Sequence, residues 1–207
     1  MFETAEVRWF WPEQNLSLVR SWFFAGSQRV AQEKRTDRYL VFPKCSSTGV
    51  KLREDRFEIK VRKDAVKPCF FPKSVEGQLE FWSKWSHDYF WPPAQLKNIH
   101  RSDAWQIISK HRLLRRFSIE GEEIASEVHE LESGCQVELT QATTNAETSP
   151  WLTLGLEAFG TDVDLEEILT KVAADFFLQH GPPPGVKLTS DNSFGYPAWL
   201  ARLGKAS

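Results

Sequence analysis

The sequence predicts an α+β protein that is mainly β, with an antiparallel sheet at its centre and helices beside it. Three observations predict this class. Segments in which polar and apolar residues alternate outnumber segments with helical periodicity. None of the alternating segments is a continuous apolar run, which favours antiparallel strands with one polar face. About eight such strands would be enough to close a barrel with an interior of its own.

Size and composition restrict the class of protein further. The chain has 207 residues, of which 41% are hydrophobic, enough for one good core. Its formal net charge of −2 excludes a general nucleic-acid binder, so any basic site must be local. No run approaches the roughly 18 apolar residues that cross a membrane, and the first six residues do not resemble a secretory signal. We expect a cytoplasmic protein, because its three cysteines are few and widely spaced: Cys45, Cys69 and Cys135.

The first half of the chain predicts one helix among several strands. The helix covers residues 15–25, with Asn15 as its N-cap and Gly26 at its end. Residues 63–78 indicate a connection. The alternating segments predict strands, the last two of them joined as a hairpin, over residues 4–10, 36–42, 50–53 and 56–62.

The second half continues the pattern and adds a long helix. Residues 78–86 fit a strand or a helix, and the strand is favoured. Further strands are expected over residues 110–117, 135–141 and 151–159, with a short helix over 124–131 between them. The capping pattern Thr161-Asp-Val-Asp precedes an amphipathic helix at 162–179, the sequence Gly-Pro-Pro-Pro-Gly ends it, and residues 197–203 suit a last short helix.

The strand at 56–62 has an unusually basic face. Arg56, Glu58, Lys60 and Arg62 share that face, while the residues between them are apolar. Such a face either lies in solvent, as in a β-sandwich, or lines a site that binds anions. The charge pattern of this strand alone does not decide between the two.

Other predicted strands carry similar polar faces. If all of them line one barrel interior, that interior holds many cations and a few carboxylates, and a bound polyanion would compensate the excess charge. Arginine contacts phosphate oxygens in pairs, and carboxylates could hold Mg²⁺ or Mn²⁺. The basic residues are Arg8, Lys51, Arg53, Arg56, Lys60, Arg62, Lys110 and Arg112, and the acidic ones are Glu6, Glu58, Glu138 and Glu157.

The order of these motifs resembles that of the CYTH, or triphosphate tunnel metalloenzyme, superfamily. That family opens with a Glu-x-Glu-x-Lys strand, in the place of which this chain has Thr4-Ala-Glu6-Val-Arg8. The later family motifs correspond to Thr36-Asp37-Arg-Tyr39, Lys51-Leu-Arg53, Glu58-Ile-Lys60-Val-Arg62, Lys110-His-Arg112, Glu138 and Gly155-Leu-Glu157. The resemblance spans roughly residues 4–180 of a single domain, and residues 181–207 follow as a Pro/Gly-rich extension.

The resemblance implies an eight-stranded antiparallel tunnel that binds a small triphosphate or polyphosphate with Mg²⁺ or Mn²⁺. Nucleic acid would enter only by a triphosphate end. A metal-activated water attacks the terminal phosphorus in those members of the family that are hydrolases. The implied metal ligands are Glu6, Glu138 and Glu157. The implied phosphate-binding residues are Arg8, Lys51, Arg53, Lys60, Arg62, Lys110 and Arg112.

Three positions depart from the family pattern. Thr4 and Gly155 stand where the family has glutamates, and Arg8 stands where it has lysine. The two lost acids lie on the metal-binding side, so we expect weakened or altered metal chemistry beside intact phosphate binding. Whether the protein is an enzyme stays open. The alternatives are a non-catalytic anion-binding or regulatory module on the same barrel, and a β-sandwich interaction protein that uses the aromatic segment 81–91.

Overall fold

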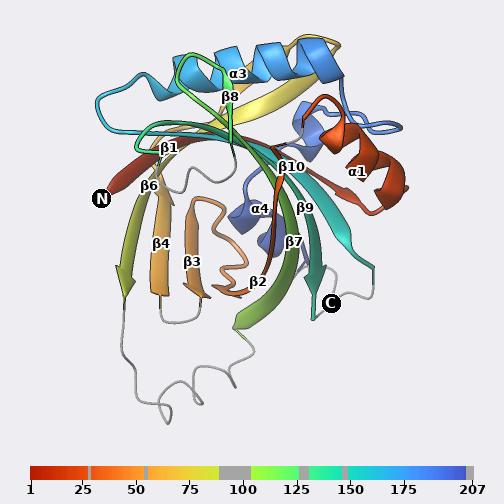
Figure 1. Ribbon diagram of the computed structural model, residues 1–207. Coiled ribbons are helices and arrows are strands. Elements are labelled where there is room, and N and C mark those ends of the chain that lie inside the picture. Colours follow the sequence, from red (N-terminus) through yellow and green to blue (C-terminus); the bar gives the residue numbers. More distant parts are fainter. Residues whose placement is uncertain (28, 54–55, 89–103, 126–130, 146–148, 204–207) are drawn as a thin grey trace.

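Eight antiparallel strands close into a barrel in the computed structural model, as the sequence predicts (Figure 1). The structure describes residues 1–27, 29–53, 56–88, 104–125, 131–145 and 149–203. The ring is closed because the first and the last strand of the order given in the next sentence also pair with each other. Around the barrel, the strands are β1 (Phe2–Pro12), β10 (Trp151–Phe159), β9 (Gly134–Thr144), β7 (Trp105–Phe117), β2 (Ala31–Leu40), β3 (Thr48–Arg53), β4 (Arg56–Arg62) and β6 (Val75–Asp88).

The main hydrophobic core lies outside the barrel wall. Helix α3 (Leu165–His180) crosses the top of the barrel in Figure 1, and α1 (Leu16–Phe24) packs beside it. Trp9 points outward from β1, and its ring meets that of Phe177 on α3 at a centroid distance of 5.8 Å. Because the apolar side chains of β1, β9 and β10 face this outer core, their polar side chains face the interior.

Several element boundaries differ from the sequence expectation. Strand β5 (Lys67–Phe71), which pairs with β6, lies where a connection was expected. Pro68 made the segment look unlike a strand, although proline is tolerated in an edge strand such as this one. Strand β2 begins at Ala31, five residues before the predicted strand. The prediction of a helix at 124–131 is wrong for its first residue, because Ile124 belongs to β8 (Glu123–Ile124), which pairs with β7. Residues 126–130 of that prediction lie outside the described part of the chain.

Helices α3 and α1 begin in different ways. Asp164 caps α3, since its carboxylate accepts a hydrogen bond from the backbone N–H of Glu167 at 3.0 Å. Asn15 stands at the N-cap of α1, as predicted, but it adopts the left-handed conformation and makes no capping hydrogen bond with its side chain. The α1 terminus therefore depends on packing rather than on a side-chain cap.

The C-terminal segment enters the barrel through a gap in the wall. Strand β1 pairs with β6 only from Phe2 to Glu6. Beyond that point the N–H of Phe194 donates to the carbonyl of Arg8 at 2.8 Å, and the N–H of Gln78 donates to Ser193 Oγ at 2.8 Å. The segment that carries the 3₁₀ turn η1 (Ser190–Asn192) thus takes the place of a missing strand pairing.

Helix α4 (Tyr196–Leu203) then fills one end of the interior, where Figure 1 shows it within the curve of the strands. Trp199 stacks on Phe10 with ring centroids 5.0 Å apart, and the rings of Tyr196 and Tyr39 stack at 5.7 Å. Phe10 and Tyr39 belong to the inward faces of β1 and β2. The segment at 181–207 that follows the resemblance in sequence therefore contributes, through α4, to the inner wall of the barrel.

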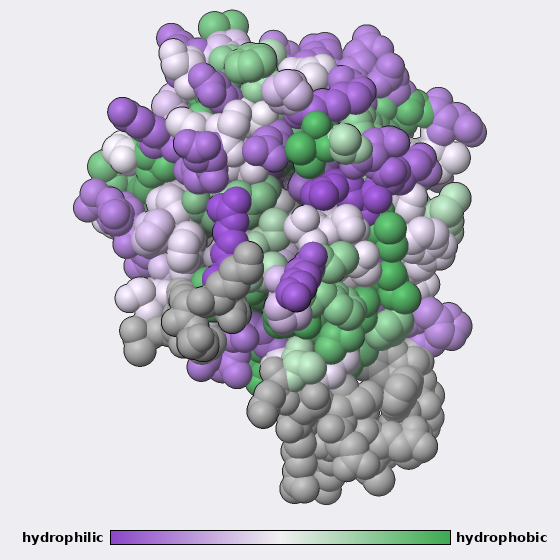
Figure 2. Space-filling view, turned by 180° about the vertical axis from the view of Figure 1, so that it is seen from behind, coloured by the Kyte–Doolittle hydropathy of each residue, from purple (hydrophilic) through white to green (hydrophobic). Residues whose placement is uncertain are grey.

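The closed barrel makes the β-sandwich alternative wrong. Its proposed aromatic patch is only partly at the surface, because Trp82 is buried and Trp85 is exposed, while residues 89–91 lie outside the described ranges. Hydrophilic side chains cover much of the upper part of the face seen in Figure 2. No helix in the described residues is both long and apolar enough to span a membrane.

Candidate functional site: a basic cavity inside the barrel

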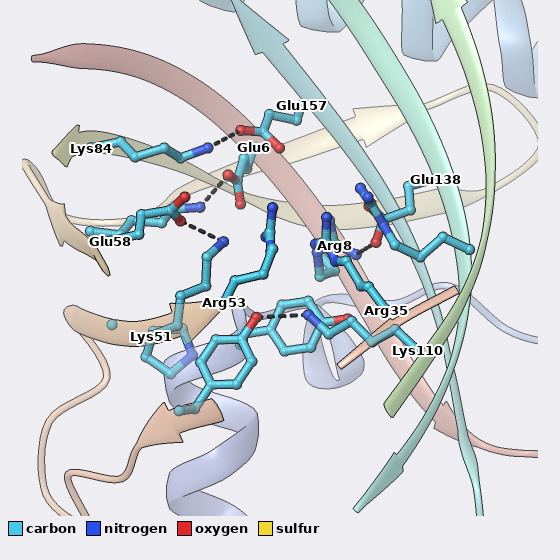
Figure 3. A pocket seen from close by; sticks show the side chains of 16 residues that line it. Glu6, Arg8, Arg35, Lys51, Arg53, Glu58, Lys84, Lys110, Glu138 and Glu157 are labelled. Atoms are coloured by element: carbon cyan, nitrogen blue, oxygen red, sulfur yellow. Dashed lines mark hydrogen bonds and ion pairs between the residues drawn. The ribbon is translucent and has the colours of Figure 1, made fainter. Parts of the chain in front are cut away.

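A cavity of about 190 Å³ lies inside the barrel, and charged side chains from most of its strands converge on it (Figure 3). Eight of its lining residues are cationic: Arg8, Arg35, Lys51, Arg53, Lys60, Lys84, Lys110 and Arg112. Four are carboxylates: Glu6, Glu58, Glu138 and Glu157. Tyr39, Gly49, Tyr196 and Pro197 complete the lining.

The structure brings together most of the site residues predicted from the sequence. All three predicted metal ligands and six of the seven predicted phosphate-binding residues line the cavity. The seventh, Arg62, lies outside the lining and pairs with Glu80 at 2.9 Å. Arg56 is the first residue of β4, where it forms an exposed ion pair with Asp88.

Sequence reasoning missed four contributors. Arg35 belongs to the part of β2 that precedes the predicted strand, whereas Tyr39 lies within that strand but was not assigned to the site. Lys84 lies on β6, whose sequence fitted either a helix or a strand. Tyr196 comes from α4, and no sequence pattern indicates that this helix enters the barrel. Extending the alternation backward from Asp37 and Tyr39 could have found Arg35.

A buried carboxylate, Asp37 on β2, organises three cations. It accepts from Arg53 Nε at 2.8 Å, and it lies 2.9 Å from Lys110 Nζ and 3.4 Å from Arg35 Nε. Burial raises the pKa of Asp37, but the charges of Lys110 and Arg35 outweigh burial and hold that pKa well below its usual value. Asp37 thus stays ionised and fixes cations that face the cavity.

Lys110 is almost completely enclosed. Besides Asp37, its amine donates to Tyr39 Oη at 2.7 Å and lies 3.8 Å from the ring centroid of Tyr196. Burial lowers the pKa of Lys110 well below its usual value, and nearby Arg35 lowers it further. Its amine is therefore positioned by β2 and α4 together.

Glu138 organises a second group of cations. Its carboxylate accepts from Arg8 Nη1 and from Arg112 Nε, each at 2.9 Å. Burial raises the pKa of Glu138, yet Arg112 and Arg8 hold it well below its usual value. Burial lowers the pKa of Arg8, but Glu138 and other acids around it raise it overall. Both groups of this pair are therefore charged.

Gly155 makes the Arg8–Glu138 pair possible. Arg8, Gly155 and Glu138 are register partners on β1, β10 and β9, so Arg8 must cross over β10 to reach Glu138. A Cβ atom at Gly155 would lie 2.4 Å from Arg8 Cζ and 2.5 Å from Nη2. The glycine leaves the space that the guanidinium fills, so two departures from the family pattern complement each other.

Gly155→Ala should test this complementarity. We expect it to lower the free energy of unfolding by about 1–3 kcal/mol, because the guanidinium is displaced from its buried partner. Chemical denaturation measures the effect. The same change in an Arg8→Ala background should cost much less, since no guanidinium is left to displace. An equal cost in both backgrounds would contradict the argument.

The three predicted metal ligands are each paired with cations of the wall. Glu6 accepts from Lys60, and Glu157 accepts from Lys84 at 2.9 Å. Glu138 is held by Arg8 and Arg112. Within the described residues, no group of three or more carboxylate, histidine or cysteine side chains converges in a way that could hold a metal ion. In this arrangement the predicted set does not fit one divalent metal.

Comparison with known proteins gives likenesses of fold only. No protein-family model matches the chain, and no curated protein matches its sequence. The PH1012 protein of Pyrococcus horikoshii OT3 aligns with a TM-score of 0.48 and 12% identity, over 97% of this chain and 98% of that one. The mimivirus capping enzyme triphosphatase aligns with a TM-score of 0.44 and 11% identity, over 86% and 88%. A chain of the Schizosaccharomyces pombe Mediator head module aligns with a TM-score of 0.42 and 8% identity, over 86% and 92%.

The eight-stranded tunnel that the resemblance implied is present in the structure itself. At these identities the likeness does not assign an activity.

Proposed function

We propose that the protein binds a polyphosphorylated anion, such as a triphosphate group, inside its barrel. The charge of the cavity carries this proposal. Eight basic and four acidic side chains line it. Asp37 behind Lys110 and Glu33 beside Arg112 and Arg35 add two more carboxylates, so the basic side chains are two in excess. Uncompensated charge is costly to enclose, and a multiply charged anion would compensate it.

The cations are also held in place before an anion arrives. Two carboxylates fix five of them: Asp37 holds Arg35, Arg53 and Lys110 from behind the lining, and Glu138 within the lining holds Arg8 and Arg112. Arginines offer paired N–H groups to phosphate oxygens, and fixed donors lose little conformational freedom on binding. The arrangement therefore favours binding of a phosphate chain over a simple structural role.

Binding of tripolyphosphate tests the proposal directly. In low salt, we expect the ligand to raise the melting temperature, with a stabilisation of about 2.7 kcal/mol at one hundred times its Kd. Orthophosphate, which carries less charge, should give a smaller shift. No shift at millimolar tripolyphosphate would overturn the proposal. A 5′-triphosphorylated oligonucleotide should bind and its 5′-hydroxyl counterpart should not, if nucleic acid is engaged only by its triphosphate end.

Tyr196 offers a further donor to the anion. Its hydroxyl is buried and has no hydrogen-bond partner in the described residues. The Arg8 guanidinium carbon lies 5.1 Å from the centroid of its ring. Tyr196→Phe should weaken tripolyphosphate binding about tenfold, as calorimetry would measure, by removing one hydrogen bond to a charged group. The unliganded variant should be at least as stable as the natural protein, and an unchanged affinity would contradict this role.

The affinity should also depend on pH through Lys51. Burial lowers the pKa of Lys51 to about 8, although Glu58 opposes the effect. An anion favours the charged amine, so binding takes up a proton above that pH and should weaken by up to about tenfold per pH unit. Lys51→Arg, which stays charged, is the matched control. Protonation of the ligand itself affects both proteins equally, so it drops out when their affinities are compared at each pH. If the affinities of the two proteins change in parallel from pH 7 to 9.5, the prediction is contradicted.

Hydrolysis of the terminal phosphate is the second candidate function. It is favoured by one observation: Glu6 and Glu157, both inward-facing, are direct partners across β1 and β10. Phosphate release from tripolyphosphate with Mg²⁺ or Mn²⁺, abolished in Glu157→Ala, would establish it. A thermal shift without phosphate release would instead establish an anion-binding module.

We also infer a reducing compartment such as the cytoplasm, since Cys45, Cys69 and Cys135 are all free thiols.

A further inference from the structure

The inward carboxylates of this barrel are separated by a fixed guanidinium. Arg8 crosses over Gly155 to reach Glu138, while Glu6 and Glu157 face each other one inward position further along the same two strands. Figure 3 shows Arg8 beside Glu138, with Glu6 and Glu157 close together to the upper left of Arg8. Arg8 is 6% exposed and also lies within 3.4 Å of Thr153 Oγ1, so its position is set by contacts on several sides.

A divalent ion in this part of the cavity would meet two obstacles. It would lie close to the guanidinium, and like charges in a poorly hydrated space repel strongly. Its carboxylate ligands would also have to leave cations that they already hold: Glu6 leaves Lys60, and Glu157 leaves Lys84. The same lysines, in contrast, can donate to phosphate oxygens while they keep their carboxylates, because an ammonium group has three N–H donors.

We propose that this barrel binds its polyphosphate without a divalent metal ion, and that the Arg8 guanidinium supplies the local positive charge that such an ion would otherwise supply. This inference rests on the proposed function. The ligand is then the metal-free anion. Because Mg²⁺ complexes tripolyphosphate in solution and reduces its charge, added Mg²⁺ should compete with the protein for the ligand and weaken the apparent binding.

Calorimetric titration of the full chain with tripolyphosphate, in EDTA and then in excess Mg²⁺ or Mn²⁺, tests this directly. We expect full binding in EDTA and weaker apparent binding with either metal. Binding that appears only with metal overturns the inference while leaving the proposed function intact. No binding under either condition overturns both. Titration of Mn²⁺ into the protein alone, followed by electron paramagnetic resonance, should show no bound ion in the barrel.

A paired substitution tests the role of Arg8. Arg8→Lys combined with Gly155→Glu shortens the cation and adds a carboxylate, and it should produce retention of Mn²⁺ together with at least a tenfold loss of affinity in EDTA. If this variant does not fold, Arg8→Lys alone should still lose about tenfold in EDTA, because lysine cannot make the paired contacts of a guanidinium. Lys67→Gln, on the outer surface, is the control. Unchanged affinity of Arg8→Lys in EDTA would overturn the role given to Arg8.

Discussion

Asp37→Asn is expected to lower the free energy of unfolding by about 3–5 kcal/mol, the largest stability effect in the barrel. The carboxylate is completely buried and lies among Lys110, Arg53 and Arg35. Removal of its charge leaves enclosed cations without compensation, which costs far more than the loss of one hydrogen bond. Urea denaturation at pH 7 measures the difference.

The matched control is the same substitution at an exposed ion pair. Asp175 pairs with Lys171 one turn away on α3, and its side chain is 61% exposed. Asp175→Asn should change stability by less than about 0.5 kcal/mol. Similar costs at the two positions would show that Asp37 does not hold the cations together.

The cost of Asp37→Asn should also depend on pH. The pKa of Asp37 is lower in the folded protein than the ordinary value of about 3.9 in an unfolded chain. Its stabilising effect is therefore fully present above about pH 5 and is lost as the pH falls toward the folded-state pKa. The difference between the variant and the natural protein should accordingly shrink below pH 4 and stay constant between pH 5 and 7.

Lys60→Ala is expected to weaken tripolyphosphate binding by about ten- to a hundredfold, the largest effect on affinity from one lysine. Lys60 lines the cavity from β4 and forms an ion pair with Glu6. Its loss removes one contact to phosphate and also leaves the negative charge of Glu6 facing the ligand, and the two effects add. Calorimetry in low salt measures the change. Arg53→Ala should act in the same direction, since Arg53 lines the same cavity from β3.

Lys63→Ala provides the control only three residues along the chain. Lys63 follows β4, pairs with Glu3 and is 44% exposed, against 18% for Lys60. Its substitution removes the same charge from the protein but not from the cavity, so affinity should stay within about twofold. If the two lysines behave alike, the binding reflects overall charge and the cavity is not the site.

The basic strand at 56–62 illustrates how much alternation alone determines. A period of two places Lys60 and Arg62 on the same face whatever the fold. In the same way it places Arg8 on one face with Glu6, and Lys110 on one face with Arg112. Because each strand must bury its apolar face, the sequence predicts both the strands and the polar faces that became the interior. The order of the motifs then indicated a closed tunnel, which the structure confirms.

The individual pairings could not be predicted in this way. Glu138 was expected to hold a metal ion, but in the structure Arg8 reaches it across the space left by Gly155. In the sequence, Gly155 shows only that a carboxylate is missing at that position. Its effect depends on the register of β1, β10 and β9, which a single strand does not encode.

The sequence by itself determined the strands, the inward cations and the presence of a local basic site, because side-chain alternation is a property of each segment alone. Only the tertiary structure decided which carboxylate meets which cation. It also decided that Tyr196 completes the cavity from α4, because the C-terminal segment enters where β1 and β6 separate. Contacts between residues distant in sequence depend on register and on the space that neighbouring side chains leave, and both exist only in the closed barrel.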